Sequence, residues 1–241
     1  MSIAVFSIKT IPDIDGGRRL YNLQDLSDKE IANVMFYKRR QETENSEFLR
    51  LHLQRVCSLS MTVHTEDGFQ LLHFNDQSEA DLIQQFYDAI TEYKVHLISW
   101  AGSSFDLPVL HYRSLIHGIS APQHWSESEE AIAPDLQAML TGFTEHADVP
   151  MSELATLLGL PGHLHISADK VWDSYRHGET DRISHATDSE VLNTHLIYLR
   201  FQLFLGRLDE TQYNAECQMI RDSLAQPQQP HLNEFLSVWS A

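Results

Sequence analysis

Apolar and polar residues alternate in the first third of the chain and predict three strands. Residues 3–8 form a β-rich run, which the turn-forming segment at residues 12–17 interrupts. Residues 56–64 alternate apolar and polar side chains, Asp67-Gly68 favours a turn, and residues 69–74 return as a strand. We therefore expect a hairpin in a mixed sheet that also contains the first strand.

Beyond the hairpin, the periodicity is mainly helical. Ser27 and the polar residues after it resemble a helix N-cap, and residues 31–36 continue that helix. One further strand is predicted at residues 95–100, and residues 123–134 are polar and irregular, as expected of a loop. The order of strands and helices predicts a mixed α/β sheet flanked by helices. The other predicted helices lie at residues 78–93, 105–116, 135–140, 151–158, 188–205 and 210–224, with a short one ending at Trp239.

Length and composition favour one domain. The chain has 241 residues, of which 42% are hydrophobic, and it contains no repeat or linker, so we expect a single domain over residues 1–241. We find no apolar run of about 18 residues and expect no membrane span. The N-terminus lacks the features of a signal peptide. Cys57 and Cys217 stand far apart, as expected of buried thiols in a reducing cytoplasm.

The charge restricts the partners. A formal net charge of −17 repels phosphate at long range and disfavours non-specific binding of nucleic acid. It leaves a metal-dependent nuclease possible, because the metal in such enzymes neutralises the phosphate. The 14 histidines are scattered without metal-ligand spacing, so we interpret them as surface and core residues.

Three segments carry a resemblance to a known family. They are residues 5–13 (VFSIKTIPD), residues 99–110 (SWAGSSFDLPVL) and residues 190–201 (EVLNTHLIYLRF). They resemble the three motifs of the predicted 3′–5′ exonucleases related to the proofreading domain of family-B DNA polymerases. Residues 16–20, 48–49, 154–155 and 158–162 resemble the scaffold of the same family, so the resemblance covers nearly the whole chain. It implies a DnaQ-like, ribonuclease-H-like fold: a mixed sheet flanked by helices.

The resemblance also implies a chemistry. In that family, four carboxylates hold two Mg²⁺ or Mn²⁺ ions about 3.5–4 Å apart for phosphodiester hydrolysis. Two of the carboxylates alternate on a strand and therefore share one face of it. The third comes from the start of a helix and the fourth from the last long helix, where a tyrosine orients the attacking water.

This chain departs from the family at its catalytic positions. Ser7 and Lys9 stand where the two strand carboxylates belong. Asp106 is retained, and Glu190 replaces the final aspartate. We expect these four side chains to cluster at the edge of the sheet, with the ammonium of Lys9 taking the electrostatic place of the metal beside Asp106 or Glu190.

Two further positions are replaced by alanine. Ala101 stands at the motif asparagine and Ala186 at the motif tyrosine, while Asp135 matches an additional acidic position of the family. Simpler interpretations of the retained residues stay open: Asp106 as a helix cap, and Glu190 as a favourable charge in a first helical turn. The basic run at residues 38–40 is then a solvated helix face, Trp100 is a core residue, and Lys9 extends into solvent.

The sequence therefore predicts a degenerate exonuclease with no intact catalytic set, in which only Asp106 and Glu190 remain as candidate metal ligands. We expect metal-dependent catalysis to be lost or strongly reduced, no cofactor, and a binding or regulatory role. The partner would be single-stranded nucleic acid or a protein. The alternative is an active Mg²⁺- or Mn²⁺-dependent hydrolase that uses Asp106, Glu190, Asp188 and Asp135. A third possibility is a pure protein-interaction module. The sequence carries no signal for an oligomeric state.

Overall fold

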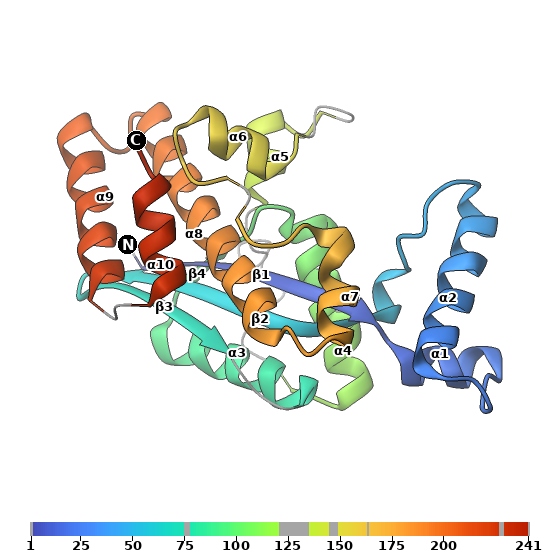
Figure 1. Ribbon diagram of the computed structural model, residues 1–241. Coiled ribbons are helices and arrows are strands. Elements are labelled where there is room, and N and C mark those ends of the chain that lie inside the picture. The colour runs from blue at the N-terminus through green and yellow to red at the C-terminus, as the bar shows by residue number, and fades with distance from the viewer. Residues whose placement is uncertain are drawn as a thin grey trace.

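The computed structural model describes residues 2–74, 78–120, 135–144, 149–162, 164–226 and 229–240. Within these ranges, a four-stranded mixed sheet has the order β3-β2-β1-β4 (Figure 1). The central strand β1 (Ile3–Pro12) pairs antiparallel with β2 (Gln54–Thr65) and parallel with β4 (His96–Ile98). Strand β3 (Gly68–Phe74) pairs antiparallel with β2 and completes the expected hairpin. The expected mixed sheet is confirmed.

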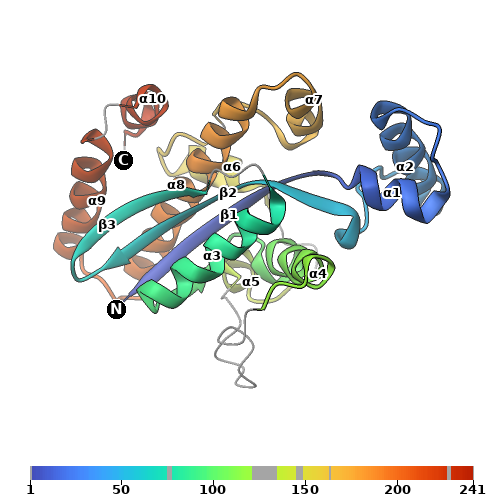
Figure 2. The same ribbon diagram turned by 90° about the horizontal axis from the view of Figure 1, so that it is seen from below.

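Helices cover both faces of the sheet, as Figure 2 shows in projection. Ala4, Phe6 and Ile8 of β1 pack with α3 (Glu79–Tyr93) and α4 (Leu107–His117). The alternate residues Ile3 and Val5 pack on the opposite face against the long helix α8 (Thr180–Phe204). Successive side chains of a strand point to opposite faces, so one central strand supplies both halves of the core. The expected arrangement of a mixed sheet flanked by helices is thereby confirmed.

The first two helices form an arm that projects beyond the end of β1 (Figures 1 and 2). Helix α1 (Ile14–Tyr21) begins where Asp13 accepts a hydrogen bond from the amide of Gly16, and α2 (Asp28–Thr43) begins with a capping box of Ser27 and Glu30. The two helices pack closely, since a Cβ atom on Gly17 would lie 2.4 Å from Met35 Sδ. The helix after Ser27 was predicted; α1 was not.

A buried ion-pair network ties this arm to the body. The guanidinium of Arg113 on α4 bonds to Glu79 on α3 at 2.8 and 2.5 Å and to Asp13 at 2.6 Å. Glu79 also accepts the amide of Val56 at 2.6 Å and a bond from His117 at 2.8 Å. The network joins two helices, a strand and the junction between β1 and α1, so it fixes the direction in which the arm leaves the sheet.

The remaining helices complete the layers around α8. They are α5 (Leu136–Thr141), α6 (Met151–Leu157), α7 (Val171–Arg176), α9 (Glu210–Ala225) and α10 (Pro230–Val238), with short 3₁₀ turns at Leu51–Leu53 and Ala168–Lys170. Of these elements, α5, α6, α9 and α10 were predicted to within a few residues; α7 and the 3₁₀ turns were not. The predicted loop at residues 123–134 lies outside the described residues. Among the described helices, none is long and apolar enough to cross a membrane.

The start of α8 corrects the sequence analysis. The helix begins at Thr180 and not at Asp188, so Glu190 lies in its interior and not in its first turn. The argument that Glu190 stabilises a helix N-terminus is therefore wrong. The segment from residue 180 to 190 is rich in polar residues, of which Thr187, Asp188 and Ser189 are buried. Because these polar residues face the interior, the apolar periodicity that would have revealed the helix is absent.

Candidate functional site

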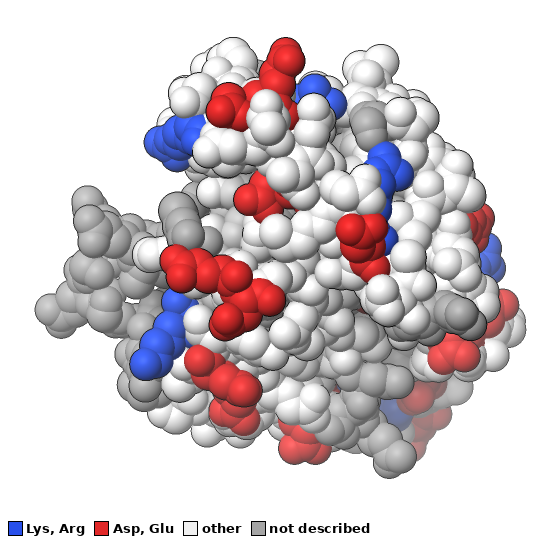
Figure 3. All heavy atoms as spheres, turned by 90° about the vertical axis from the view of Figure 1, so that its left-hand side faces the viewer, with Lys and Arg blue, Asp and Glu red and all other residues white. Residues whose placement is uncertain are grey.

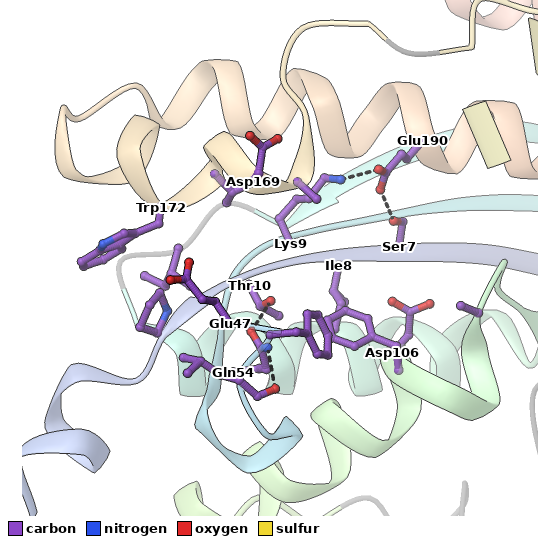
Figure 4. Close-up of a pocket in the computed structure, with 18 of the residues that line it drawn as sticks. Ser7, Ile8, Lys9, Thr10, Glu47, Gln54, Asp106, Asp169, Trp172 and Glu190 are labelled. Atoms are coloured by element: carbon purple, nitrogen blue, oxygen red, sulfur yellow. Dashed lines mark hydrogen bonds and ion pairs between the residues drawn. The ribbon is translucent and has the colours of Figure 1, made fainter. Parts of the chain in front are cut away.

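The candidate site begins with two side chains of β1. Ser7 and Lys9 lie two residues apart on the strand and both point towards α8, as Figure 4 shows. Ser7 Oγ donates to Glu190 Oε2 at 3.0 Å, and the ammonium of Lys9 forms an ion pair with Glu190 Oε1. The Lys9 side chain is only 8% exposed, so it does not extend into solvent.

Asp106 comes from the other side of the strand. A π-helical turn at Gly102–Asp106 leads into α4 and places the buried carboxyl of Asp106 where it accepts a hydrogen bond from Ser99 Oγ. Asp106 makes no side-chain capping bond to α4, so the interpretation as a helix cap is wrong. Burial raises the pKa of Asp106 to about 7; the Ser99 bond opposes the rise and the nearby Glu190 adds to it.

These residues line one large cleft of ≈ 1050 Å³, called the cleft below. Ser7, Lys9, Ala101, Asp106 and Glu190 all contribute to its wall. The structure thus brings together five of the six motif positions singled out in the sequence. Aromatic side chains from the arm and the body complete the wall: Phe36, Phe48, Trp100, Phe105 and Trp172.

The sixth position, Ala186, lines an adjacent pocket of ≈ 300 Å³, called the side pocket below. It shares Trp100, Met151, Ala168 and Glu190 with the cleft. Ala186 is itself nearly buried, at 3% exposure. Trp100 is therefore a wall residue as well as a partly buried core residue.

Asp188 forms hydrogen bonds with a different set of residues. Its buried carboxylate accepts bonds from Ser60 Oγ at 2.5 Å, His231 Nε2 at 3.0 Å and His73 Nδ1 at 3.2 Å. Burial alone would raise the pKa of Asp188, but the bonds from His231, His73 and Ser60 hold it well below its usual range. Sequence analysis missed this cluster because its members come from three distant segments with no recognisable spacing.

Asp135 has a local structural role. Its carboxylate caps α5 by accepting the amide of Ala138 at 2.9 Å, and it also accepts the amide and hydroxyl of Ser103 at 3.1 and 2.6 Å. Among the described residues that line the cleft, neither Asp135 nor Asp188 is present. Asp135 still lies near enough to Asp106 for its charge to raise the pKa of that carboxyl, whereas Asp188 bonds to Ser60, His73 and His231.

The donors in the cleft do not fit a pair of divalent cations. Mg²⁺ and Mn²⁺ require several oxygen ligands each, and here Glu190 is already paired with an ammonium. Across the part of the chain that the structure describes, no group of three His, Cys, Asp or Glu side chains is arranged to hold a metal ion. The disagreement begins at Ser7 and Lys9, which bring a hydroxyl and an ammonium to Glu190.

The outer wall of the cleft carries acidic side chains, each of which has a hydrogen-bond or ion-pair partner within the protein. Asp169 accepts a bond from Ser167 at 2.5 Å, and Asp173 lies 3.7 Å from Arg176. Glu47 forms an ion pair with Arg40, the last residue of the basic run at residues 38–40. That run lies on α2, as the helix-face interpretation requires. Sequence analysis missed the contribution of the arm and of α7 to the cleft, since neither carries a motif.

A family model described as "Predicted 3'-5' exonuclease related to the exonuclease domain of PolB" matches residues 46–239. Among solved structures, the chain is similar to the family B DNA polymerase from the hyperthermophilic archaeon Pyrobaculum calidifontis, with a TM-score of 0.54 and 15% sequence identity. The similarity covers 85% of this chain but 24% of the polymerase, so it shows the fold alone. A search of curated proteins found no match.

Proposed function

We propose, from the premise that the chain belongs to the family of predicted 3′–5′ exonucleases related to the exonuclease domain of PolB, that it is an exonuclease-like domain without metal-dependent hydrolysis, acting in binding or regulation. The observation that carries the proposal is the ion pair between Lys9 and Glu190. In this proposal the ammonium of Lys9 takes the electrostatic place that a divalent cation holds in two-metal nucleases.

The ion pair resists replacement by a metal. A divalent cation that approached Glu190 would meet the positive charge of Lys9 at close range. Displacing Lys9 would leave a buried ammonium without its carboxylate, which costs several kcal/mol in protein interiors. Ser7 adds a hydroxyl donor to the same carboxylate, where a metal site would need an additional oxygen ligand. Glu190 is therefore satisfied without a metal.

Loss of the metal removes the main source of rate acceleration. In two-metal hydrolysis, the ions activate the attacking water and stabilise the leaving oxygen. Each 1.4 kcal/mol of lost transition-state stabilisation lowers the rate about tenfold. Lys9, the cation of the cleft that contacts Glu190, is engaged by that carboxylate and does not supply this charge stabilisation. The remaining capacity of the domain is binding.

The charge of the molecule favours a protein partner over single-stranded nucleic acid. The net charge is −17, and the face in Figure 3 carries acidic side chains spread among mostly uncharged ones, with basic side chains between them. Such a surface repels phosphate and attracts basic surfaces. The active alternative, with Mg²⁺ or Mn²⁺ held by Asp106, Glu190, Asp188 and Asp135, requires Asp188 and Asp135 to leave their present partners.

The test is a nuclease assay on labelled single-stranded DNA and RNA, with Mg²⁺ and with Mn²⁺. We expect no digestion above the level of a matched sample in EDTA, because the cleft does not hold the metal pair. Asp106→Ala serves as the control for a contaminating nuclease, since contamination would be unaffected by it. Metal-dependent digestion from the 3′ end by the wild type, lost in Asp106→Ala, would show that the domain is an active exonuclease.

A further inference from the structure

We propose that the side pocket beside Ala186 is a binding site for a small uncharged bicyclic ring that carries an N–H or O–H donor. This ligand class goes beyond the proposed function, because its recognition requires neither a metal nor a phosphate. The argument rests on the size of the pocket, on its walls and on the position of Glu190.

The size of the pocket sets the size of the ligand. The side pocket measures ≈ 300 Å³. A protein cavity of about 150 Å³ holds one benzene ring, so this pocket has room for two fused rings. The room exists because Ala186 has a single methyl group at a position where α8 faces Gly162 and residues 164–168. A large side chain at residue 186 would fill it.

The walls are suited to a flat apolar face. Trp100, Met151, Leu164, Ile166 and Ala186 are apolar residues of the lining, and Trp100 offers an aromatic surface against which another ring can pack. Such pockets, apolar with a few polar groups, are typical of small-molecule sites. The four residues shared with the cleft make the two spaces neighbours, which gives a ligand a path from solvent through the larger one.

Glu190 supplies the polar recognition. Its Oε1 is paired with Lys9 and its Oε2 accepts from Ser7, but each carboxylate oxygen has two lone pairs and can accept a second bond. Two hydroxyl side chains also line the pocket, Ser152 and Ser189, and Ser189 donates to the carbonyl of His185 at 2.9 Å. A ligand that donates a hydrogen bond to Glu190 therefore fits this wall.

The charges of the lining decide against an anion. None of the described residues that line the side pocket is a lysine or an arginine. Lys9 lines the cleft and is not among the described residues that line the side pocket. An anionic ligand would bring its charge next to a carboxylate in a partly buried space, with no cation on that wall to stabilise it.

The experiment is a calorimetric titration in EDTA with three matched rings: indole, 1-methylindole and indole-2-carboxylate. We expect indole to bind. We expect 1-methylindole, which lacks the donor, to bind about tenfold more weakly, and the carboxylate to show no binding. Adenine, titrated in parallel, distinguishes a purine from an indole as the natural class. Because EDTA removes divalent cations, the result is independent of whether the cleft can bind a metal.

Filling the pocket tests its location. Ala186→Phe should abolish the binding of indole, while Ala215→Phe, the same substitution at an exposed position of α9, should leave it unchanged. Ala186→Leu fills less of the pocket and provides a second variant if Ala186→Phe does not fold. The proposal is overturned if a folded Ala186 variant binds indole like the wild type, if the carboxylate binds as well as indole, or if neither indole nor adenine binds.

Discussion

At the scale of single residues, Ser7 and Lys9 decide what the cleft can bind. Replacing them together, as Ser7→Asp with Lys9→Glu, removes the competing ammonium and adds two carboxylates beside Glu190 and Asp106. Oxygen ligands of this kind are those that Mn²⁺ and Mg²⁺ prefer. We expect the affinity for Mn²⁺, measured by calorimetry, to rise at least about tenfold, corresponding to about 1.4 kcal/mol.

The matched control for that double variant is Ser237→Asp with Lys94→Glu, which makes the same two changes at exposed positions that do not line the cleft. It should leave the affinity for Mn²⁺ near that of the wild type. If the wild type already binds Mn²⁺ as tightly as Ser7→Asp/Lys9→Glu, then Lys9 does not replace a metal.

The raised pKa of Asp106 predicts how the free energy of unfolding depends on pH. Its pKa rises from the ordinary value of 3.8 to about 7 because the carboxyl is buried, so the folded state holds this proton more tightly than the unfolded state. The free energy of unfolding should therefore fall as the pH rises from about 4 to about 7, by up to about 4 kcal/mol from this group. The amide of Asp106→Asn has no proton to lose in this pH range, so this variant should lack the decrease in the free energy of unfolding that comes from Asp106.

The measurement is urea unfolding of the wild type and Asp106→Asn at about pH 5 and about pH 8. We expect Asp106→Asn to lose less stability between the two values than the wild type does. Asp67→Asn, at an exposed position in the β2–β3 turn, is the control and should follow the wild type. Parallel curves for the wild type and Asp106→Asn would contradict the burial argument.

Much of the cleft could be predicted at this scale. The motif strings place Ser7 and Lys9 on one face of a strand, and Glu190 on the last long helix, so their meeting follows from alternation and topology. The partners of the Asp188 carboxylate could not be predicted, since His73 and His231 reach it only through tertiary packing. The absence of a cap at Asp106 depends on the π-helical turn before α4, which has no clear sequence signature.

At the scale of elements, the arm depends on Arg113. Its side chain is 3% exposed and joins Glu79 to Asp13, so Arg113→Met would leave two carboxylates buried without their cation. We expect a loss of roughly 3 to 5 kcal/mol in the free energy of unfolding, since breaking a buried pair leaves an uncompensated charge. Urea unfolding provides the measurement.

Arg40→Met is the comparison, because Arg40 pairs with Glu47 on the surface of the arm. Exposed pairs contribute about 0 to 1 kcal/mol, so this variant should remain close to the wild type. Equal stability of Arg113→Met and Arg40→Met would show that the network does not hold the arm to the body.

Two causes explain why α1 and the start of α8 were missed. The segment Pro12–Gly17 contains a proline, two aspartates and two glycines and is typical of a turn, yet Asp13 caps a helix there and Gly17 permits close packing against Met35. The first turns of α8 are polar because their side chains are satisfied inside the fold, as Thr187 is by Ser58 at 2.8 Å. Local periodicity identifies elements that bury apolar residues; it does not identify those that bury polar ones.

At the scale of the whole molecule, charge should prevail over any residual affinity for nucleic acid. With a net charge of −17, a short labelled single-stranded DNA in EDTA should show no binding by fluorescence polarisation, even at low ionic strength, where attraction would be strongest. Raising the salt concentration should leave the fluorescence polarisation of the labelled DNA unchanged. Micromolar binding that weakens steeply with added salt would reveal a basic surface strong enough to outweigh the overall charge.

Helix α8 passes through the centre of the molecule, and from Ala186 to Gln202 nearly every residue is buried. Its backbone amides in that stretch are shielded by the sheet on one side and by α6, α7, α9 and α10 on the others. Such amides exchange with deuterium only when the entire fold opens, whereas those of the α1–α2 arm exchange through local opening. The slowest exchange rates in this protein therefore belong to the helix that carries Glu190.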